Sequence, residues 1–211
     1  MIALSWSGGK DSALALWEMQ RAGAPPDLLL TTVDEASGRL PHHGVAVELV
    51  RAQAASAALP LVEVAIPADA PNAVYEQRLA AALGHHRVRA VAFGDLFLED
   101  LRAYRESRLA EAGLEARFPL WGRDTAALAR AFVDAGFRAI VVSAVDRSLL
   151  GRPYDHALLD ALPAGVDPCG ENGEFHTFVW AGPVLRAPLA VAAGLVREVH
   201  GFPQQDLLLT G

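Results

Sequence analysis

Short runs of apolar residues alternate with longer alanine-rich segments along the first two thirds of the chain. The short runs are nearly continuous in apolar side chains, which is typical of strands that are buried on both faces. They predict strands at Ile2–Ser5, Leu28–Val33, Leu61–Ile66, Ala90–Phe93 and Ala139–Ser143. The longer segments predict helices at Ser12–Ala22, Val45–Leu59, Asn72–Leu83, Leu98–Ala112 and Thr125–Ala135, with a short extended piece at Glu115–Phe118.

This alternation predicts an α/β fold: a doubly wound, mostly parallel, Rossmann-like sheet of five strands with helices on both faces. In such folds, ligands bind beyond the carboxyl ends of the strands, where the strand order reverses. After Ser143 the rhythm gives way to a segment rich in glycine and proline, which predicts a small lid-like subdomain with short strands and little helix. We therefore expect one domain at residues 1–143 and a C-terminal subdomain at residues 144–211.

Composition excludes several classes of protein. Of the 211 residues, 52% are hydrophobic, which excludes a disordered chain. The net charge of −7 argues against a dedicated nucleic-acid-binding surface. The single cysteine, Cys169, excludes an intramolecular disulfide and a cysteine-rich metal site. No apolar run has transmembrane length and no signal peptide is recognisable, so we expect a soluble cytoplasmic protein without membrane contact.

The distribution of basic residues is uneven, with 17 arginines and one lysine, Lys10. A bias of base composition in the genome explains the bulk count, because either cation serves at most surface positions. The position of the remaining lysine is informative, since a compact, flexible ammonium fits a narrow glycine loop better than a planar guanidinium.

That lysine lies in the string Ser7-Gly8-Gly9-Lys10-Asp11-Ser12, which connects the first strand to the first helix. Two glycines allow a close backbone approach, the helix N-terminus offers free N–H groups, and serine hydroxyls and a lysine add further donors. Together they predict a cradle for phosphate or pyrophosphate. Asp11 either caps the helix or holds Mg²⁺ beside the phosphates. The string fits neither the Walker pattern nor the dinucleotide pattern, and the alternative is a plain glycine turn with a serine-rich cap.

A second polar string occurs between Gly170 and Thr177. It contains two carboxylates, an amide and an imidazole: Glu171, Asn172, Glu174 and His176. Such a loop could bind a cation, an amine or ammonia, or perform acid–base chemistry. In an extended stretch, Glu174 and His176 would share one face. The alternative is a polar hairpin turn, because Asn-Gly is a strong hairpin signal.

Weaker candidates follow other predicted strands and helices. Gly94 and Asp95 come directly after the fourth strand, where glycine admits a nucleotide and Asp95 could meet a ribose hydroxyl, a metal or an amine; the alternative is a helix N-terminus. Arg102, Arg105 and Arg108 lie along one side of a helix, where guanidinium groups could bind phosphate or carboxylate, although a solvated face paired with glutamates explains them generically.

The two strings together resemble the diphthine–ammonia ligase family of N-type ATP pyrophosphatases. The resemblance also includes Pro119-Leu120-Trp121 and the helical segment from Tyr104 to Arg108, and it extends from Ile2 to about Pro183. The form with Asn172 and His176 resembles the bacterial branch, whereas diphthamide belongs to elongation factor 2 of archaea and eukaryotes. We therefore expect the ATP chemistry to carry over and the acceptor to differ.

The resemblance implies an adenine-nucleotide α-hydrolase-like fold that binds ATP with Mg²⁺ and forms AMP and pyrophosphate. The implied acceptor is a carboxylate on a small molecule or a modified protein side chain, which is adenylated and then amidated by ammonia. The implied catalytic residues are Lys10, Asp11, Glu171 and Glu174, with Asp11 also a candidate Mg²⁺ ligand. The implied nucleotide-binding residues are Ser7, Gly8, Gly9, Lys10, Asp11, Ser12, Val33 and Gly94. The implied substrate-binding residues are His43, Asp95, Tyr104, Arg105, Trp121, Asn172 and His176.

Two other functions share the first string. A tRNA-modifying enzyme with the same loop should show a basic stripe and catalytic or metal-binding cysteines, and the negative net charge and the single Cys169 argue against it. A non-catalytic adenine-nucleotide-binding protein should bind ATP without turnover, and it gives no reason for the acidic second string. A homodimer through the C-terminal part is a further expectation.

Overall fold

A computed structural model describes residues 1–199 and 202–210, and it confirms the α/β class and the alternation of strands and helices as far as α5. The strands of the first sheet are β1 (Ile2–Ser5), β2 (Leu28–Asp34), β3 (Leu61–Ile66), β4 (Ala90–Ala92) and β5 (Glu115–Arg117). The helices between and after them are α1 (Lys10–Arg21), α2 (Val47–Ala57), α3 (Asn72–His85), α4 (Glu99–Glu111) and α5 (Thr125–Asp134). None of the helices within the described residues is long and apolar enough to span a membrane.

The first sheet is parallel throughout, with the strand order β3-β2-β1-β4-β5. From β1 the chain winds outward to β3, then crosses to β4 on the other side of β1. The order therefore reverses between β1 and β4, which is where a doubly wound sheet leaves a crevice for a ligand. The phosphate-loop string follows β1, and Gly94 and Asp95 follow β4, so the two strings flank this crevice.

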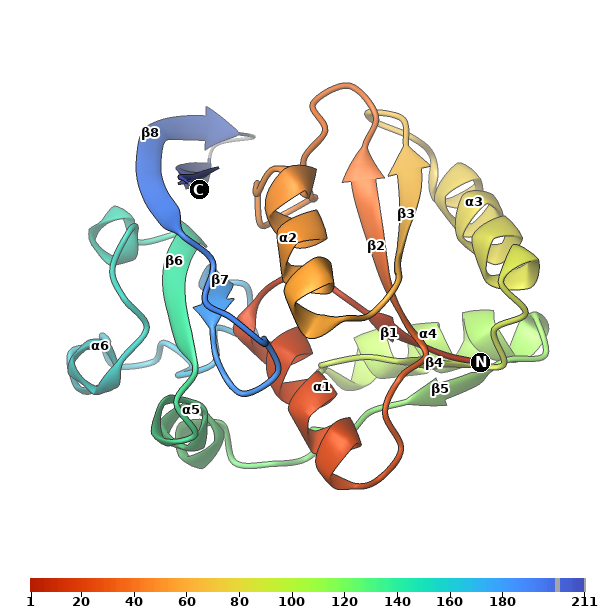
Figure 1. The fold of residues 1–211 in the computed structure, drawn as a ribbon, viewed down its shortest axis with the longest axis horizontal. Coiled ribbons are helices and arrows are strands. Elements are labelled where there is room, and N and C mark those ends of the chain that lie inside the picture. The colour runs from red at the N-terminus through yellow and green to blue at the C-terminus, as the bar shows by residue number, and fades with distance from the viewer. Residues whose placement is uncertain (200–201, 211) are drawn as a thin grey trace.

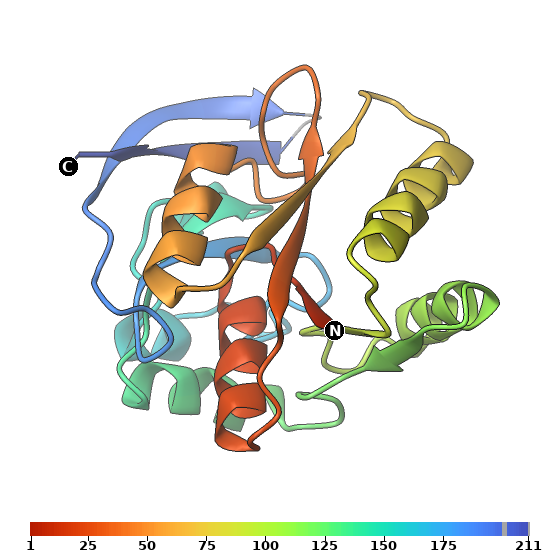
Figure 2. The ribbon, with the colours of Figure 1, turned by 45° about the vertical axis from the view of Figure 1, so that its right-hand side comes forward.

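Helices cover both faces of the parallel sheet (Figures 1 and 2). α1 and α2 lie on the face that looks toward the C-terminal part of the chain, and a single apolar core joins them to both sheets through side chains such as Leu4, Leu16 and Phe178. α3 and α4 cover the opposite face, where Leu30, Val91 and Leu109 belong to a second, smaller core. The alternation of side chains along each strand assigns neighbouring residues to opposite faces.

The second sheet is antiparallel, with the order β7-β6-β9-β8. Its strands are β6 (Arg138–Ala144), β7 (Phe175–Ala181), β8 (Val191–Val199) and β9 (Phe202–Leu209), and the short helices η1 (Arg147–Leu149) and α6 (His156–Asp160) follow β6. The sequence predicted Ala139–Ser143 as the fifth strand of the parallel sheet, and this is wrong. The fifth parallel strand is β5. The prediction failed because an apolar run indicates that a strand is buried but not in which sheet it lies.

The expectation of short C-terminal strands is also wrong, since β7, β8 and β9 have 7, 9 and 8 residues. Most of the glycines and prolines that suggested short strands lie in the loop before β7 or the turn after it. β6 spans the domain boundary predicted between residues 143 and 144, and it pairs with strands that follow that boundary. That boundary stays a prediction.

Candidate functional site

The loop between β1 and α1 is held in place by two hydrogen bonds that the backbone carbonyl of Gly8 accepts, one from β7 and one from α2. Gly8 has a positive φ of 76°, and its carbonyl oxygen accepts hydrogen bonds from Val179 N at 2.9 Å and from Gln53 Nε2 at 2.9 Å. The amide of Gln53, which is 0% exposed, also accepts from Trp6 Nε1 at 3.0 Å. Because every polar atom of Gln53 is used in this way, α2 and β7 together fix the shape of the loop.

Lys10 is the buried cation of this loop, with only 4% exposure. Its Nζ lies 2.8 Å from Asp11 Oδ2. The same atom lies 5.8 Å from the ring centroid of Tyr154 and 5.5 Å from that of Phe175. Burial disfavours the charge, but Asp11 and the other acidic groups more than offset it, so the pKa of Lys10 is raised. The backbone N–H of Lys10 donates to Thr177 Oγ1 at 3.0 Å. Residues of the second sheet therefore enclose the lysine.

The two serines of the loop bind its backbone. Ser12 Oγ donates to Gly9 O at 2.9 Å, and Gly9 N donates to Ser7 Oγ at 3.3 Å. The two hydroxyl oxygens are 3.4 Å apart. The serine hydroxyls thus stabilise the turn at the start of α1, in keeping with the expected cradle.

Gly94 packs directly against the start of α1. A Cβ built on Gly94 would lie 2.8 Å from the carbonyl carbon of Asp11 and 3.1 Å from Ser12 N. These are backbone atoms, so neither can rotate away. The glycine is therefore needed for the close approach of β4 to the phosphate loop.

Gly94→Ala should destabilise the protein by about 1–3 kcal/mol, because the added methyl group must push the start of α1 aside. The matched control is Gly84→Ala, since Gly84 lies in α3 with nothing within 4 Å of a built Cβ. That change should be neutral or stabilise by about 0.5–1 kcal/mol. Urea denaturation of the two variants measures both effects, and equal stability of the two would contradict the packing argument.

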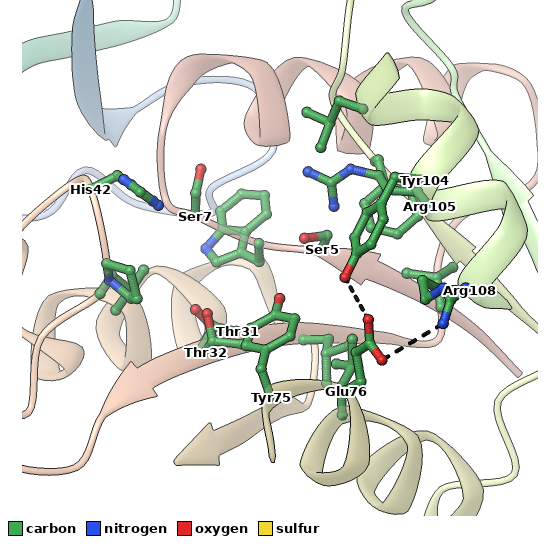
Figure 3. A pocket seen from close by; sticks show the side chains of 18 of the residues that line it. Ser5, Ser7, Thr31, Thr32, His42, Tyr75, Glu76, Tyr104, Arg105 and Arg108 are labelled. Carbon is green, nitrogen blue, oxygen red and sulfur yellow. Dashed lines mark hydrogen bonds and ion pairs between the residues drawn. The ribbon is translucent and has the colours of Figure 1, made fainter. Parts of the chain in front are cut away.

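A pocket of about 360 Å³ opens beside the loop, between α3 and α4 (Figure 3). Its floor is apolar and comes from the outer face of the parallel sheet and from the two helices. The floor residues include Leu30, Leu79, Leu83, Val91, Phe93 and Leu109. Polar residues surround it: Ser5, Ser7, Thr31, Thr32, His42, His43, Tyr75, Glu76, Tyr104, Arg105, Arg108 and His176. An apolar floor with a few convergent polar groups is the usual form of a small-molecule site.

The α4 side of the pocket carries two sets of polar contacts. Tyr104 Oη donates to Glu76 Oε1 at 2.8 Å, and Arg108 lies 3.8 Å from the other oxygen of Glu76 (Figure 3). Arg105 lies over the ring of Phe93 at 4.2 Å, with its Nε 2.8 Å from Asp95 Oδ2. That contact is too poorly aligned to count as a hydrogen bond. Arg105 is thus anchored by Asp95 at its Nε, and Figure 3 shows its guanidinium group directed into the pocket.

The loop side of the pocket carries imidazoles. The His43 and His176 rings lie 4.6 Å apart, and His43 Nδ1 donates to Thr177 O at 3.2 Å. Burial and the neighbouring His176 hold the pKa of His43 well below its ordinary value. Burial, Lys10 and His42 lower the pKa of His176 to about 4. Both rings are therefore neutral at pH 7, and the Nδ1 bond leaves Nε2 of His43 as a hydrogen-bond acceptor.

The two carboxylates of the second string are used differently. Glu174 accepts from the backbone N–H groups of Asp167 and Asn172, each at 3.0 Å, and from Asn172 Nδ2 at 3.0 Å, so it closes its own loop. Glu171 reaches across to the segment after β4, where Leu96 N donates to its Oε1 at 2.7 Å. Glu174 precedes β7 and makes these loop contacts, whereas His176 lines the pocket, so the two do not form one surface.

The pKa of Glu171 is raised to about 7. The main cause is burial, and the charges of Asp11 and Asp95 act in the same direction, while the Leu96 hydrogen bond and Lys10 oppose it. Cys169 lies beside this group, is 3% exposed, and has a pKa raised to about 12, mainly by burial. A thiol with such a pKa is not a nucleophile at pH 7.

The remaining predicted site residues, apart from the loop residues Gly8, Gly9, Ser12 and Gly94 and the pair Asn172 and Glu174 described above, fall into three places. The pocket brings together Ser7, His43, Tyr104, Arg105 and His176. Lys10, Asp11, Asp95 and Glu171 interact electrostatically beside the pocket. Val33 and Trp121 lie outside the pocket lining: Val33 is 7% exposed in the core, and Trp121 packs on Phe118 and Arg102.

Several pocket and loop residues were not predicted from the sequence. Tyr75 and Glu76 lie on α3, where the sequence shows nothing but a helical pattern. Arg108 was interpreted as part of a solvated face, and its pairing with Glu111 at 2.7 Å fits that, but it also lines the pocket. Gln53 and Thr177 bind the phosphate loop through contacts that span 45 and 167 residues, which no local pattern reveals.

Comparison with family models gives two matches. The diphthamide synthase N-terminal domain matches residues 1–116, and the diphthamide synthase C-terminal domain matches residues 124–202. The first match covers the parallel sheet and ends within β5. The second covers α5 and the strands β6, β7 and β8, and it ends at the first residue of β9. A comparison with curated proteins finds no match.

Proposed function

Because the chain belongs to the diphthamide synthase family, whose members are ATP pyrophosphatases of the diphthine–ammonia ligase kind, we propose that it joins ammonia to an acceptor carboxylate. ATP adenylates the carboxylate, ammonia displaces AMP, and the products are an amide, AMP and pyrophosphate. The observation that best supports this is the meeting of the phosphate loop with Glu171. Lys10, the buried cation of the loop, interacts electrostatically with Glu171, whose pKa is raised to about 7.

The phosphate loop would hold the triphosphate of ATP. The N-terminus of α1 and the Lys10 ammonium favour the negative charge of the leaving pyrophosphate. The apolar pocket floor suits the adenosine. Gly94 packs on the backbone at the start of α1 and stays a predicted neighbour of the nucleotide. Val33 stays a predicted neighbour of the adenine through its strand, although Thr31 and Thr32 line the pocket directly.

Asp11 fits the expected Mg²⁺ ligand. Mg²⁺ commonly binds through one or two carboxylates together with substrate phosphates, and the Asp11 side chain is 31% exposed at the start of α1. Within residues 1–199 and 202–210, no cluster of three or more histidine, cysteine, aspartate or glutamate side chains could hold a metal on its own. The phosphates of ATP would therefore complete the ligand set, and the metal would offset their charge.

Ammonia would enter on the side of Glu171. The carboxylates of Asp11 and Asp95 act on Glu171, and their negative charge favours a cation beside it. An ammonium ion would lose a proton to Glu171, and the resulting ammonia would attack the acyl adenylate. Asn172 and Glu174 shape the loop that presents Glu171.

The acceptor would enter over the polar rim of the pocket. Arg105 offers a guanidinium to a carboxylate, and Tyr104, His43 and His176 offer neutral polar groups around it. We propose that the acceptor is a carboxylate-bearing small molecule or a modified protein side chain. Asp95 acts in this scheme by anchoring Arg105, and Trp121 stays a predicted wall of the same cleft.

The test is product analysis. The protein is incubated with ATP, Mg²⁺, ammonium and a panel of carboxylate acceptors, and the nucleotides are separated. We expect AMP and pyrophosphate in equal amounts, with the amide appearing only when ammonium is present. Formation of ADP and phosphate would contradict the proposal, and ATP binding without turnover across the panel would favour a nucleotide-binding protein without catalysis.

A further inference from the structure

A buried carboxylate on the C-terminal strand β9 binds the loop that follows β2. Asp206 is 7% exposed, and Arg39 binds it with both terminal nitrogens, at 2.7 and 3.2 Å. A second arginine, Arg197 on β8, lies 3.0 Å from Oδ2 of the same carboxylate. Asp206 therefore joins the loop after β2 to the β8–β9 hairpin, at a separation of 167 residues.

Arg39 and its neighbour Gln204 also hold the backbone of that loop. Arg39 Nη1 donates to Gly44 O at 2.6 Å, and Gln204 Nε2 donates to His42 O at 3.4 Å. The Gln204 side chain lies so close to Gly44 that a Cβ there would collide with it. Two residues of the loop adopt left-handed conformations, His42 with φ 61° and Gly44 with φ 68°. Such a conformation costs a non-glycine residue about 1 kcal/mol or more. The contacts from β9 add to the backbone hydrogen bonds that close the turn itself, such as the one from Gly44 N to Leu40 O at 3.0 Å.

The strained turn sets the position of two pocket residues. His42 and His43 both line the pocket, and Figure 3 shows His42 on the side opposite Arg105 and Tyr104. The His43 ring lies over the phosphate loop, because a Cβ built on Gly9 would be 2.8 Å from His43 Cε1. A shift of the loop that contains Gly44 would therefore move the imidazole that covers Gly9.

We propose that Arg39, Gln204 and Asp206 form a clamp that positions His42 and His43 over the phosphate loop, so that the affinity for ATP depends on strand β9. The clamp residues are positioning residues, since only the histidines that they place line the pocket. The inference rests on the proposed function in one respect, namely that ATP is the ligand of this pocket. It gives the β8–β9 hairpin a part in the nucleotide site of the other domain.

Arg39→Gln tests the clamp, with Arg197→Gln as the matched control. Both changes remove one arginine from Asp206, but only Arg39 also binds the loop backbone. If Arg39→Gln leaves the loop in its binding position about a tenth of the time, the Kd for ATP rises about tenfold. Arg197→Gln should leave the Kd within about twofold of the unaltered protein. Isothermal titration with ATP and Mg²⁺ measures the Kd and the fraction of binding-competent protein separately.

The two parameters distinguish positioning from a merely structural role. If the substitution only left part of the protein misfolded, the number of sites per chain would fall and the folded remainder would bind ATP with an unchanged Kd. That result would overturn the clamp. Gln204→Met provides a second route if Arg39→Gln folds poorly, because it keeps the side-chain volume and removes the amide near His42; it should also raise the Kd. An unchanged Kd in the folded variants overturns the clamp alone. Absence of ATP binding by the unaltered protein overturns the proposed function, and the clamp with it.

Discussion

Lys10→Arg is expected to lower the ATP-dependent release of pyrophosphate about a hundredfold or more while the protein stays folded. The lysine Nζ occupies a narrow position, 2.8 Å from Asp11 and between the rings of Tyr154 and Phe175, with 4% exposure. A guanidinium keeps the charge that Asp11 needs, but it is planar and wider, so its charge cannot reach the same point. The leaving pyrophosphate then loses the aligned cation.

Pyrophosphate release under saturating ATP measures the effect, and thermal unfolding shows whether the variant is folded. Lys10→Met serves as the comparison, because it removes the charge and keeps the length of the side chain. It should lose as much activity and, unlike Lys10→Arg, leave the Asp11 carboxylate without its partner, which lowers stability. Full activity of Lys10→Arg would show that position 10 needs only a positive charge.

Glu171→Gln is expected to reduce amide formation by a factor of about a hundred to ten thousand. The variant then depends on free ammonia, whose share keeps rising with pH, so its rate should no longer level off above pH 7. The carboxylate form is the one that accepts a proton from ammonium. With a pKa of about 7, this form is present above pH 7 and declines below it. The rate of the unaltered enzyme should therefore fall about tenfold per unit as the pH drops below 7. Glutamine keeps the acceptor oxygen for Leu96 N but does not titrate.

Glu174→Gln is the matched control for this prediction. Its carboxylate closes the loop through Asp167 and Asn172, so the change should lower stability and reduce the rate moderately, while the acidic limb near pH 7 remains. Initial rates of amide formation from pH 5 to pH 9, at saturating total ammonium and constant ionic strength, separate the two variants. A rate of Glu171→Gln that still levels off above pH 7 would assign the titration to another group and remove the proposed base.

The positions of the candidate site residues were predictable where these residues belong to a local motif. The string from Ser7 to Ser12 is a strand–loop–helix unit, and its glycines, hydroxyls and lysine act within a few residues of one another. Gly94 and Asp95 were predictable because the carboxyl ends of parallel strands share one edge of the sheet. His43 and His176, suggested by a family resemblance, do line the pocket, and their 4.6 Å ring contact needed the fold.

The roles of the two glutamates show where local patterns fail. Glu171 and Glu174 are equivalent in the sequence, three residues apart in one polar loop. Their difference arises because Leu96, 75 residues away, donates to one of them, while backbone N–H groups of the loop itself bind the other. Strand membership fails for the same reason. The apolar run of β6 fits a buried strand in either sheet, and its antiparallel pairing with β7 depends on segments that follow it in the chain.

The sequence by itself determined the α/β class, the phosphate loop and the family, because periodicity and motif chemistry are properties of neighbouring residues. Only the tertiary structure decided which sheet each strand joins, which glutamate accepts from Leu96 N, and that strand β9 holds the loop of His42 and His43. Those outcomes depend on pairings between residues far apart in the chain, such as Arg39 with Asp206, whose free energy exists only once the two sheets have folded together.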